Sequence, residues 1–99
     1  MRTYYVYMLR CIDGTFYTGV TNDIERRFHE HSTGHDPWCY TYSRRPLRLA
    51  YAGEFQYIDR AINFEKQLKG WSHKKKRAFA DGDWPLLKRL AMGRVTDSR

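Results

Sequence analysis

The chain of 99 residues has no apolar run long enough to cross a lipid bilayer. A membrane-spanning helix needs about 20 consecutive apolar residues. The residues after Met1-Arg2 do not form the apolar core of a secretory leader. We therefore expect a soluble, cytoplasmic protein that does not contact a membrane.

Cysteine is scarce, because only Cys11 and Cys39 are present. A single disulfide is one interpretation, but two thiols in a chain without a secretory leader are more often reduced. We expect both to be small packing side chains. The alternative is a zinc site formed by Cys11, His31, His35 and Cys39, although this spacing matches no compact zinc-finger pattern.

Acidic residues are few in the C-terminal part of the chain. Residues 1–59 contain 7 Lys and Arg and 7 Asp and Glu, whereas residues 60–99 contain 11 and 4. The net charge of +7 therefore comes from the last forty positions. A domain that is basic at one end can bind a polyanion, although a solvated basic face explains the same composition.

Hydrophobic and aromatic residues are plentiful, at 41% and 16% of the chain. A chain of this size folds as one domain around a shared core, and we find no internal repeat. We assign this domain to residues 1–92. Residues 93–99 have no packing pattern, so we expect a flexible tail there.

The N-terminal pattern predicts a β-hairpin followed by a helix. Residues 4–11 are rich in β-branched and aromatic residues and largely apolar on both faces, which is typical of a central strand covered from both sides. Asp13-Gly14 is a strong hairpin turn, and residues 16–20 form the returning strand. In the helix that follows, Arg27 and His31 lie four residues apart and face either solvent or a cleft.

Residues 32–46 form a long connection, and loops above about 12 residues in compact domains are usually functional. Its second half interleaves three aromatic residues with two arginines: Trp38, Tyr40, Tyr42, Arg44 and Arg45. This mixture suits stacking on bases and pairing with phosphates. The alternative is that the rings cover the sheet and the arginines are solvated.

Residues 47–55 predict a third strand, which joins the sheet out of sequence order. In the next helix a 3.6-residue period places five residues on the core side: Ile58, Ala61, Ile62, Glu65 and Leu68. A carboxylate in the centre of an apolar stripe is costly unless it is paired or binds a metal. Glu65 therefore either forms a buried salt bridge, with Arg27 as the obvious partner, or ligates a metal.

Two short helices complete the pattern. Ser72 caps the first, which carries a broad basic knob of Lys74, Lys75, Lys76 and Arg77. Asp83 caps the second, whose core contacts are Leu86, Leu87, Leu90 and Met92. The whole chain predicts an α/β (α+β) fold, with a small three-stranded, mainly antiparallel sheet flanked by helices in the order ββαβαα and a further C-terminal helix.

Three features at these spacings resemble the GIY-YIG nuclease superfamily: Tyr5-Val6-Tyr7, then Tyr17-Thr18-Gly19, then Arg27 with His31. The chain looks like one of its small stand-alone bacterial members. The match is not literal, because Tyr5, Val6 and Thr18 replace the Gly, the first Ile and the second Ile of the family pattern.

The resemblance implies a metal-dependent endonuclease that hydrolyses phosphodiester bonds in DNA and is structure-specific and linked to DNA repair or recombination. It implies five catalytic residues: Tyr7, Tyr17, Arg27, His31 and Glu65. Glu65 would hold a single divalent ion, Mg²⁺ or Mn²⁺. Arg27 would pair with the scissile phosphate. Tyr17 would deprotonate water or relay its proton, if cations lower its pKa, while Tyr7 and His31 orient the water.

We expect a nucleic acid, most of all DNA, to contact a set of basic side chains: Arg44, Arg45, Lys69, Lys74, Lys75, Lys76 and Arg77. Because members of the superfamily are often fused to DNA-binding parts that we do not find in this sequence, a partner protein could supply the target. Two alternatives stay open, a non-catalytic nucleic-acid-binding module and a nuclease subunit that needs its partner. Phosphate contacts carry no base information, so the sequence does not separate DNA structures or exclude RNA.

Overall fold

The computed structural model describes the backbone of residues 2–97 and the side chains of residues 2–91. An antiparallel sheet with the strand order β2-β1-β3 lies at its centre. Its strands are β1 (Tyr4–Arg10), β2 (Phe16–Thr21) and β3 (Arg48–Phe55). The helices described are α1 (Ile24–Thr33), α2 (Ile58–Lys69), α3 (His73–Ala80) and α4 (Trp84–Asp97). The predicted fold class and element order are confirmed.

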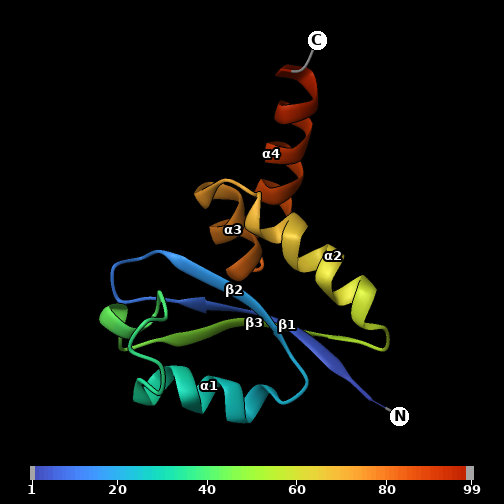
Figure 1. Ribbon diagram of the computed structural model, residues 1–99. Coiled ribbons are helices and arrows are strands. Elements are labelled where there is room, and N and C mark those ends of the chain that lie inside the picture. Colours follow the sequence, from blue (N-terminus) through green and yellow to red (C-terminus); the bar gives the residue numbers. More distant parts are fainter. Residues whose placement is uncertain (1, 98–99) are drawn as a thin grey trace.

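The sheet separates two layers of helices. α1 covers one face, whereas α2, α3 and α4 lie on the other side (Figure 1). β1 lies between the other two strands and buries side chains on both faces, as its apolar pattern predicted. Val6 and Met8 pack with Leu68 on the face of α2, while Tyr7 and Leu9 belong to a second cluster that includes residues of α1.

Local sequence signals determine the hairpin turn between β1 and β2 and both ends of α1. Gly14 adopts a left-handed φ of 84° in the hairpin turn, a conformation that glycine accepts without strain. The side chain of Asp23 caps α1 by accepting a hydrogen bond from the Arg26 N–H at 3.1 Å. Gly34, with a φ of 72°, ends the helix. His31 is thereby held in the last turn of α1, above the sheet.

The predicted core face of α2 is wrong at two positions. Ala61, Glu65 and Leu68 are buried, but Ile58 and Ile62 are exposed. Phe64 packs on the core instead. The stripe that meets the sheet is therefore centred nearer to Phe64 than the sequence period suggested, and Glu65 stays within it.

The C-terminal helices begin where the sequence predicted. Ser72 caps α3 and Asp83 accepts a hydrogen bond from the Leu86 N–H at 3.2 Å. α4 continues to Asp97 and so includes residues 93–97 of the expected tail. The side chain of Met92 lies outside the described residues, and the domain boundary at residue 92 stays a prediction. No described helix is both long and apolar enough to span a membrane.

Candidate active site

Two tyrosines on neighbouring strands form the floor of the site. The register of β1 and β2 places Tyr7 opposite Gly19 and Leu9 opposite Tyr17, so both tyrosine rings lie on the face of α1. Their ring centroids are 6.3 Å apart. A Cβ at Gly19 would lie 2.5 Å from the Tyr7 Oη, so the Tyr7 ring needs a glycine there. This is the physical reason for glycine in the Tyr17-Thr18-Gly19 motif.

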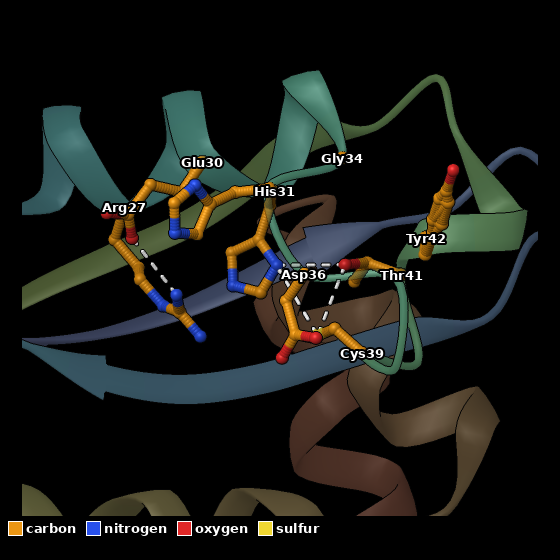
Figure 2. Close-up of a pocket in the computed structure, with 9 residues that line it drawn as sticks. Arg27, Glu30, His31, Gly34, Asp36, Cys39, Thr41 and Tyr42 are labelled. Carbon is orange, nitrogen blue, oxygen red and sulfur yellow. Dashed lines mark hydrogen bonds and ion pairs between the residues drawn. The ribbon is translucent and has the colours of Figure 1, made fainter.

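His31 joins these tyrosines from above. It is 4% exposed, and its Nε2 lies 2.9 Å from the Tyr7 Oη. Its Nδ1 lies 2.8 Å from the hydroxyl of Thr41, which in turn donates to the sulfur of Cys39 at 3.4 Å. Figure 2 shows the ring pointing toward Thr41 and Cys39. Both ring nitrogens of His31 are therefore engaged, and in the neutral ring one of them donates while the other accepts.

Burial keeps all three rings uncharged at neutral pH. It lowers the pKa of His31 to about 4, and the nearby charge of Arg27 acts in the same direction. Burial raises the pKa of Tyr7 to about 12. Burial also raises the pKa of Tyr17, and the cations Arg27 and Lys69 do not offset this effect. The charges of the chain alone therefore do not lower the Tyr17 pKa as the sequence analysis required.

Arg27 and Glu65 do not pair with each other, so the alternative of a salt bridge between them is wrong, although each forms another ion pair. The Arg27 Nη1 lies 3.0 Å from Glu30 Oε1, one turn along α1. The Lys69 Nζ lies 2.6 Å from Glu65 Oε2, one turn along α2. In both cases the charge pairs with an oppositely charged side chain three or four residues away on the same helix. Arg27 keeps further N–H donors free of Glu30, since a guanidinium carries five.

Glu65 approaches the site from the opposite layer of helices. It is 9% exposed on α2, which packs against the edge strand β2 as well as against β1. Its hydrogen bond raises the pKa of Lys69, and Tyr17 is close enough to contribute to the same shift. The Glu65–Lys69 pair therefore lies near Tyr17, at the edge of the sheet.

Glu65 offers one carboxylate to a hard divalent cation, and Lys69 already pairs with one of its oxygens. Mg²⁺ is commonly held by one or two carboxylates together with substrate phosphates and water, and Glu65 supplies one such carboxylate. The zinc alternative is not supported: no three His, Cys, Asp or Glu side chains within residues 2–91 are placed to share a metal. Both ring nitrogens of His31 are already engaged by Tyr7 and Thr41. Both cysteines are free thiols.

The loop between α1 and β3 packs onto the site through Tyr40. The Tyr40 ring stacks on Tyr17 with an interplanar angle of 19°, and the Arg44 guanidinium lies 3.8 Å from the centre of the same ring. The Arg44 Nε also lies 3.1 Å from Asp13 Oδ2 in the hairpin turn. Arg45 covers Tyr42 in the same way. Both arginines therefore support the loop, and their contact with nucleic acid stays a prediction.

The remaining residues predicted to bind nucleic acid are Lys69 and the basic knob of α3. Lys69 is engaged with Glu65 beside the site. The knob of Lys74, Lys75, Lys76 and Arg77 lies on α3, in the layer of helices opposite α1 (Figure 1). The ammonium of Lys75 lies 4.3 Å from the centre of the Trp71 ring. The helix that carries the knob begins at the hairpin turn, where His73 Nε2 donates to the Gly14 carbonyl at 2.8 Å, and Arg44 contacts Asp13 in the same turn. Contact of the knob with nucleic acid stays a prediction.

The sequence analysis missed three supporting residues. Glu30 could have been found, because it lies three positions from Arg27 on one helix. Tyr40 was expected either to stack on bases or to cover the sheet, and its partner, the strand residue Tyr17, was not predicted because their packing joins distant segments. Thr41 gave no signal, since a hydroxyl in an irregular loop is ordinarily solvated. In the structure it is 1% exposed and bound to His31.

Fold and site together define a class of protein. It is a small α+β domain in which two strand tyrosines and a histidine of the first helix cluster on one face of an antiparallel sheet, with an arginine on the same helix and a buried glutamate on the second helix. Residues 3–78 match the family model described as the GIY-YIG catalytic domain. The chain belongs to this nuclease family, and the resemblance found in the sequence is confirmed.

The relatives are small proteins of bacteria and archaea. A UPF0213 protein of Limosilactobacillus reuteri is 38% identical over 77% of this chain and 80% of its own length. One from Haloquadratum walsbyi is 36% identical over 79% of this chain and 86% of its own. The solution structure of the UPF0213 protein BH0048 from Bacillus halodurans is similar, with a TM-score of 0.52 and 37% identity over 80% of this chain and 83% of that one. The protein EF2693 from E. faecalis has a TM-score of 0.57 and 30% identity over 83% and 86%.

Proposed function

We propose that this protein is a metal-dependent endonuclease that hydrolyses phosphodiester bonds in DNA. The observation that carries the proposal is the buried hydrogen-bonded pair of Tyr7 and His31 beside Tyr17, in a chain of the GIY-YIG family. Packing alone does not require a histidine and two tyrosine hydroxyls under α1. Phosphodiester hydrolysis requires positioned water, positive charge at the phosphate and a path for protons.

Arg27 is the group that binds the scissile phosphate. Its side chain is one-third exposed, and Glu30 holds one edge of the guanidinium in place. The planar fork of an arginine matches two phosphate oxygens at once. Arg27 therefore orients the phosphate against the tyrosine pair.

Tyr17 is the group that contacts the attacking water. Tyr7 is only 1% exposed, whereas Tyr17 is partly exposed and so reaches the substrate. Because burial raises the pKa of Tyr17, its hydroxyl is neutral at pH 7. A neutral hydroxyl can take the proton of the attacking water while it gives its own proton to an oxygen of the substrate phosphate, which passes it to the leaving oxygen, so Tyr17 acts as a relay without prior ionisation. Tyr7 and His31 fix the geometry beneath it.

Glu65 is the residue that would hold Mg²⁺ or Mn²⁺. A bound divalent cation supplies positive charge that neutralises the phosphate. Lys69 competes with the cation for this carboxylate, because its ammonium lies on Glu65 Oε2, and the cation would displace it. The released ammonium is then free to contact a neighbouring phosphate, which agrees with the place of Lys69 among the expected nucleic-acid-binding residues.

The test is a cleavage assay at low salt with end-labelled single-stranded, duplex, splayed, flapped and four-way DNA, and with a single-stranded RNA. We expect wild type to cut with Mg²⁺ and to stop with a chelator. Tyr17→Phe should cut about 10²- to 10⁴-fold more slowly. Tyr57→Phe, at an exposed tyrosine, is the matched control and should cut like wild type.

Tight binding without any cutting would contradict the proposal. It would favour a non-catalytic module, or a nuclease subunit that waits for a protein partner. The assay also decides between DNA and RNA. A role in DNA repair and a cytoplasmic location stay predictions of the sequence.

A further inference from the structure

Trp38 presents a bare aromatic ring next to the candidate active site. It is 95% exposed, which is unusual for the largest apolar side chain. The two residues that follow it both contact the site. The sulfur of Cys39 lies 3.8 Å from His31 Nδ1, and the Tyr40 ring stacks on Tyr17. Since consecutive Cα atoms are about 3.8 Å apart, Trp38 lies at the rim of the same site.

Hydrogen bonds fix the backbone of the loop at Trp38. The Trp38 N–H donates to Asp36 Oδ1 at 3.0 Å, and the Cys39 N–H donates to the Asp36 carbonyl at 3.1 Å. The Tyr40 hydroxyl donates to Thr15 Oγ1 at 2.9 Å, which ties the loop to the hairpin turn. Because the backbone at Trp38 is fixed, a ligand that stacks on the ring orders only the side-chain torsions of this residue.

The three aromatic residues of this loop have different environments. Arg44 covers the ring of Tyr40, and Arg45 covers the ring of Tyr42. Neither tyrosine therefore offers a bare face like that of Trp38. A nucleobase is the partner whose chemistry fits a flat ring beside arginines at a phosphate-binding site, because bases stack on aromatic rings while arginines pair with the backbone.

The same geometry selects the kind of nucleic acid. Within a duplex, neighbouring bases cover both faces of each base, and exposing one costs unstacking energy. An unpaired base offers its face without that cost. We propose that Trp38 stacks on an unpaired base of the substrate strand beside the phosphate that is cut, so that the substrate class is DNA with a single-stranded segment at the cleavage point. The inference rests on the proposed function and names the substrate of that site.

The test measures binding of fluorescently labelled single-stranded DNA in a Glu65→Gln background, where cutting is suppressed. We expect Trp38→Ala to weaken this binding about 5- to 100-fold, the range of one base stacked on an aromatic ring. Trp38→Phe should recover most of the loss, and binding to blunt duplex should be unchanged. Trp84→Ala is the matched control, because Trp84 is also exposed and lies at the start of α4.

A second readout locates the base. Abasic sites are placed one at a time along the single strand. At one position the missing base should weaken binding by the protein that retains Trp38 but should not weaken binding by Trp38→Ala. Equal affinity of Trp38→Ala and its parent for single-stranded DNA would overturn the inference and would indicate that the ring serves another partner, such as a protein. If the two affinities are equal but wild type cuts DNA, the stacking of Trp38 is refuted and the proposed nuclease function is retained. If Trp38→Ala weakens the binding of single-stranded DNA but wild type cuts no substrate, the stacking is retained and the proposed nuclease function is refuted.

Discussion

Acidification should destabilise this protein through His31. The side chain is 4% exposed, and burial lowers its pKa from 6.5 to about 4. The unfolded chain therefore binds this proton at a higher pH than the folded protein does. The stabilisation is present above pH 6.5 and is lost as the pH falls toward 4. With these two pKa values, the loss between pH 7 and pH 4.5 is about 2 kcal/mol.

Urea unfolding at the two pH values measures this loss. Carboxylates also titrate in this range, so the informative quantity is the difference between wild type and His31→Gln, which removes only the imidazole. Wild type should lose about 2 kcal/mol more than the variant. His29→Gln, at an exposed histidine of the same helix, should follow wild type. An equal loss in wild type and His31→Gln would refute the buried, neutral state of His31.

Three other substitutions test separate parts of the structure. Gly19→Ala places a Cβ 2.5 Å from the Tyr7 Oη, so we expect a lower melting temperature and slower cutting, measured on the same preparation. Leu68→Ala empties a fully buried position of α2 and should lower the free energy of unfolding by about 2–5 kcal/mol in urea titrations. Lys69→Met removes the ammonium that occupies Glu65, so Mn²⁺ affinity by electron paramagnetic resonance should rise at least about 5-fold. Unchanged Mn²⁺ affinity would contradict the competition.

The elements that the sequence predicted well depend on signals within a few residues. Asp13-Gly14 defines its own turn, and Asp23 caps a helix that begins one residue later. Glu65 was identified as buried because its position in the α2 period was correct. Ile58 and Ile62 were misplaced because a helical period gives a stripe without fixing which edge of that stripe meets the sheet.

The contacts that escaped prediction join segments through irregular backbone. The hydrogen bond between His31 and Thr41 depends on the path of a loop, and no periodicity describes that path. The same loop stacks Tyr40 on Tyr17 but leaves Trp38 95% exposed, although the sequence pattern does not distinguish the two rings. The alternative partner of Glu65, Arg27, was wrong for the reverse reason, because Lys69 on the same helix pairs with Glu65 instead.

The most direct test of the central claim is the single-turnover rate at which wild type and Glu65→Gln cut an end-labelled DNA that carries a single-stranded flap, in Mg²⁺. Glu54→Gln is the control, because Glu54 is exposed on β3. The account predicts a loss of at least about 100-fold for Glu65→Gln, since the carboxylate for the cation is gone. Glu54→Gln should retain the wild-type rate. A Glu65→Gln rate equal to that of wild type would contradict metal-dependent hydrolysis at this site.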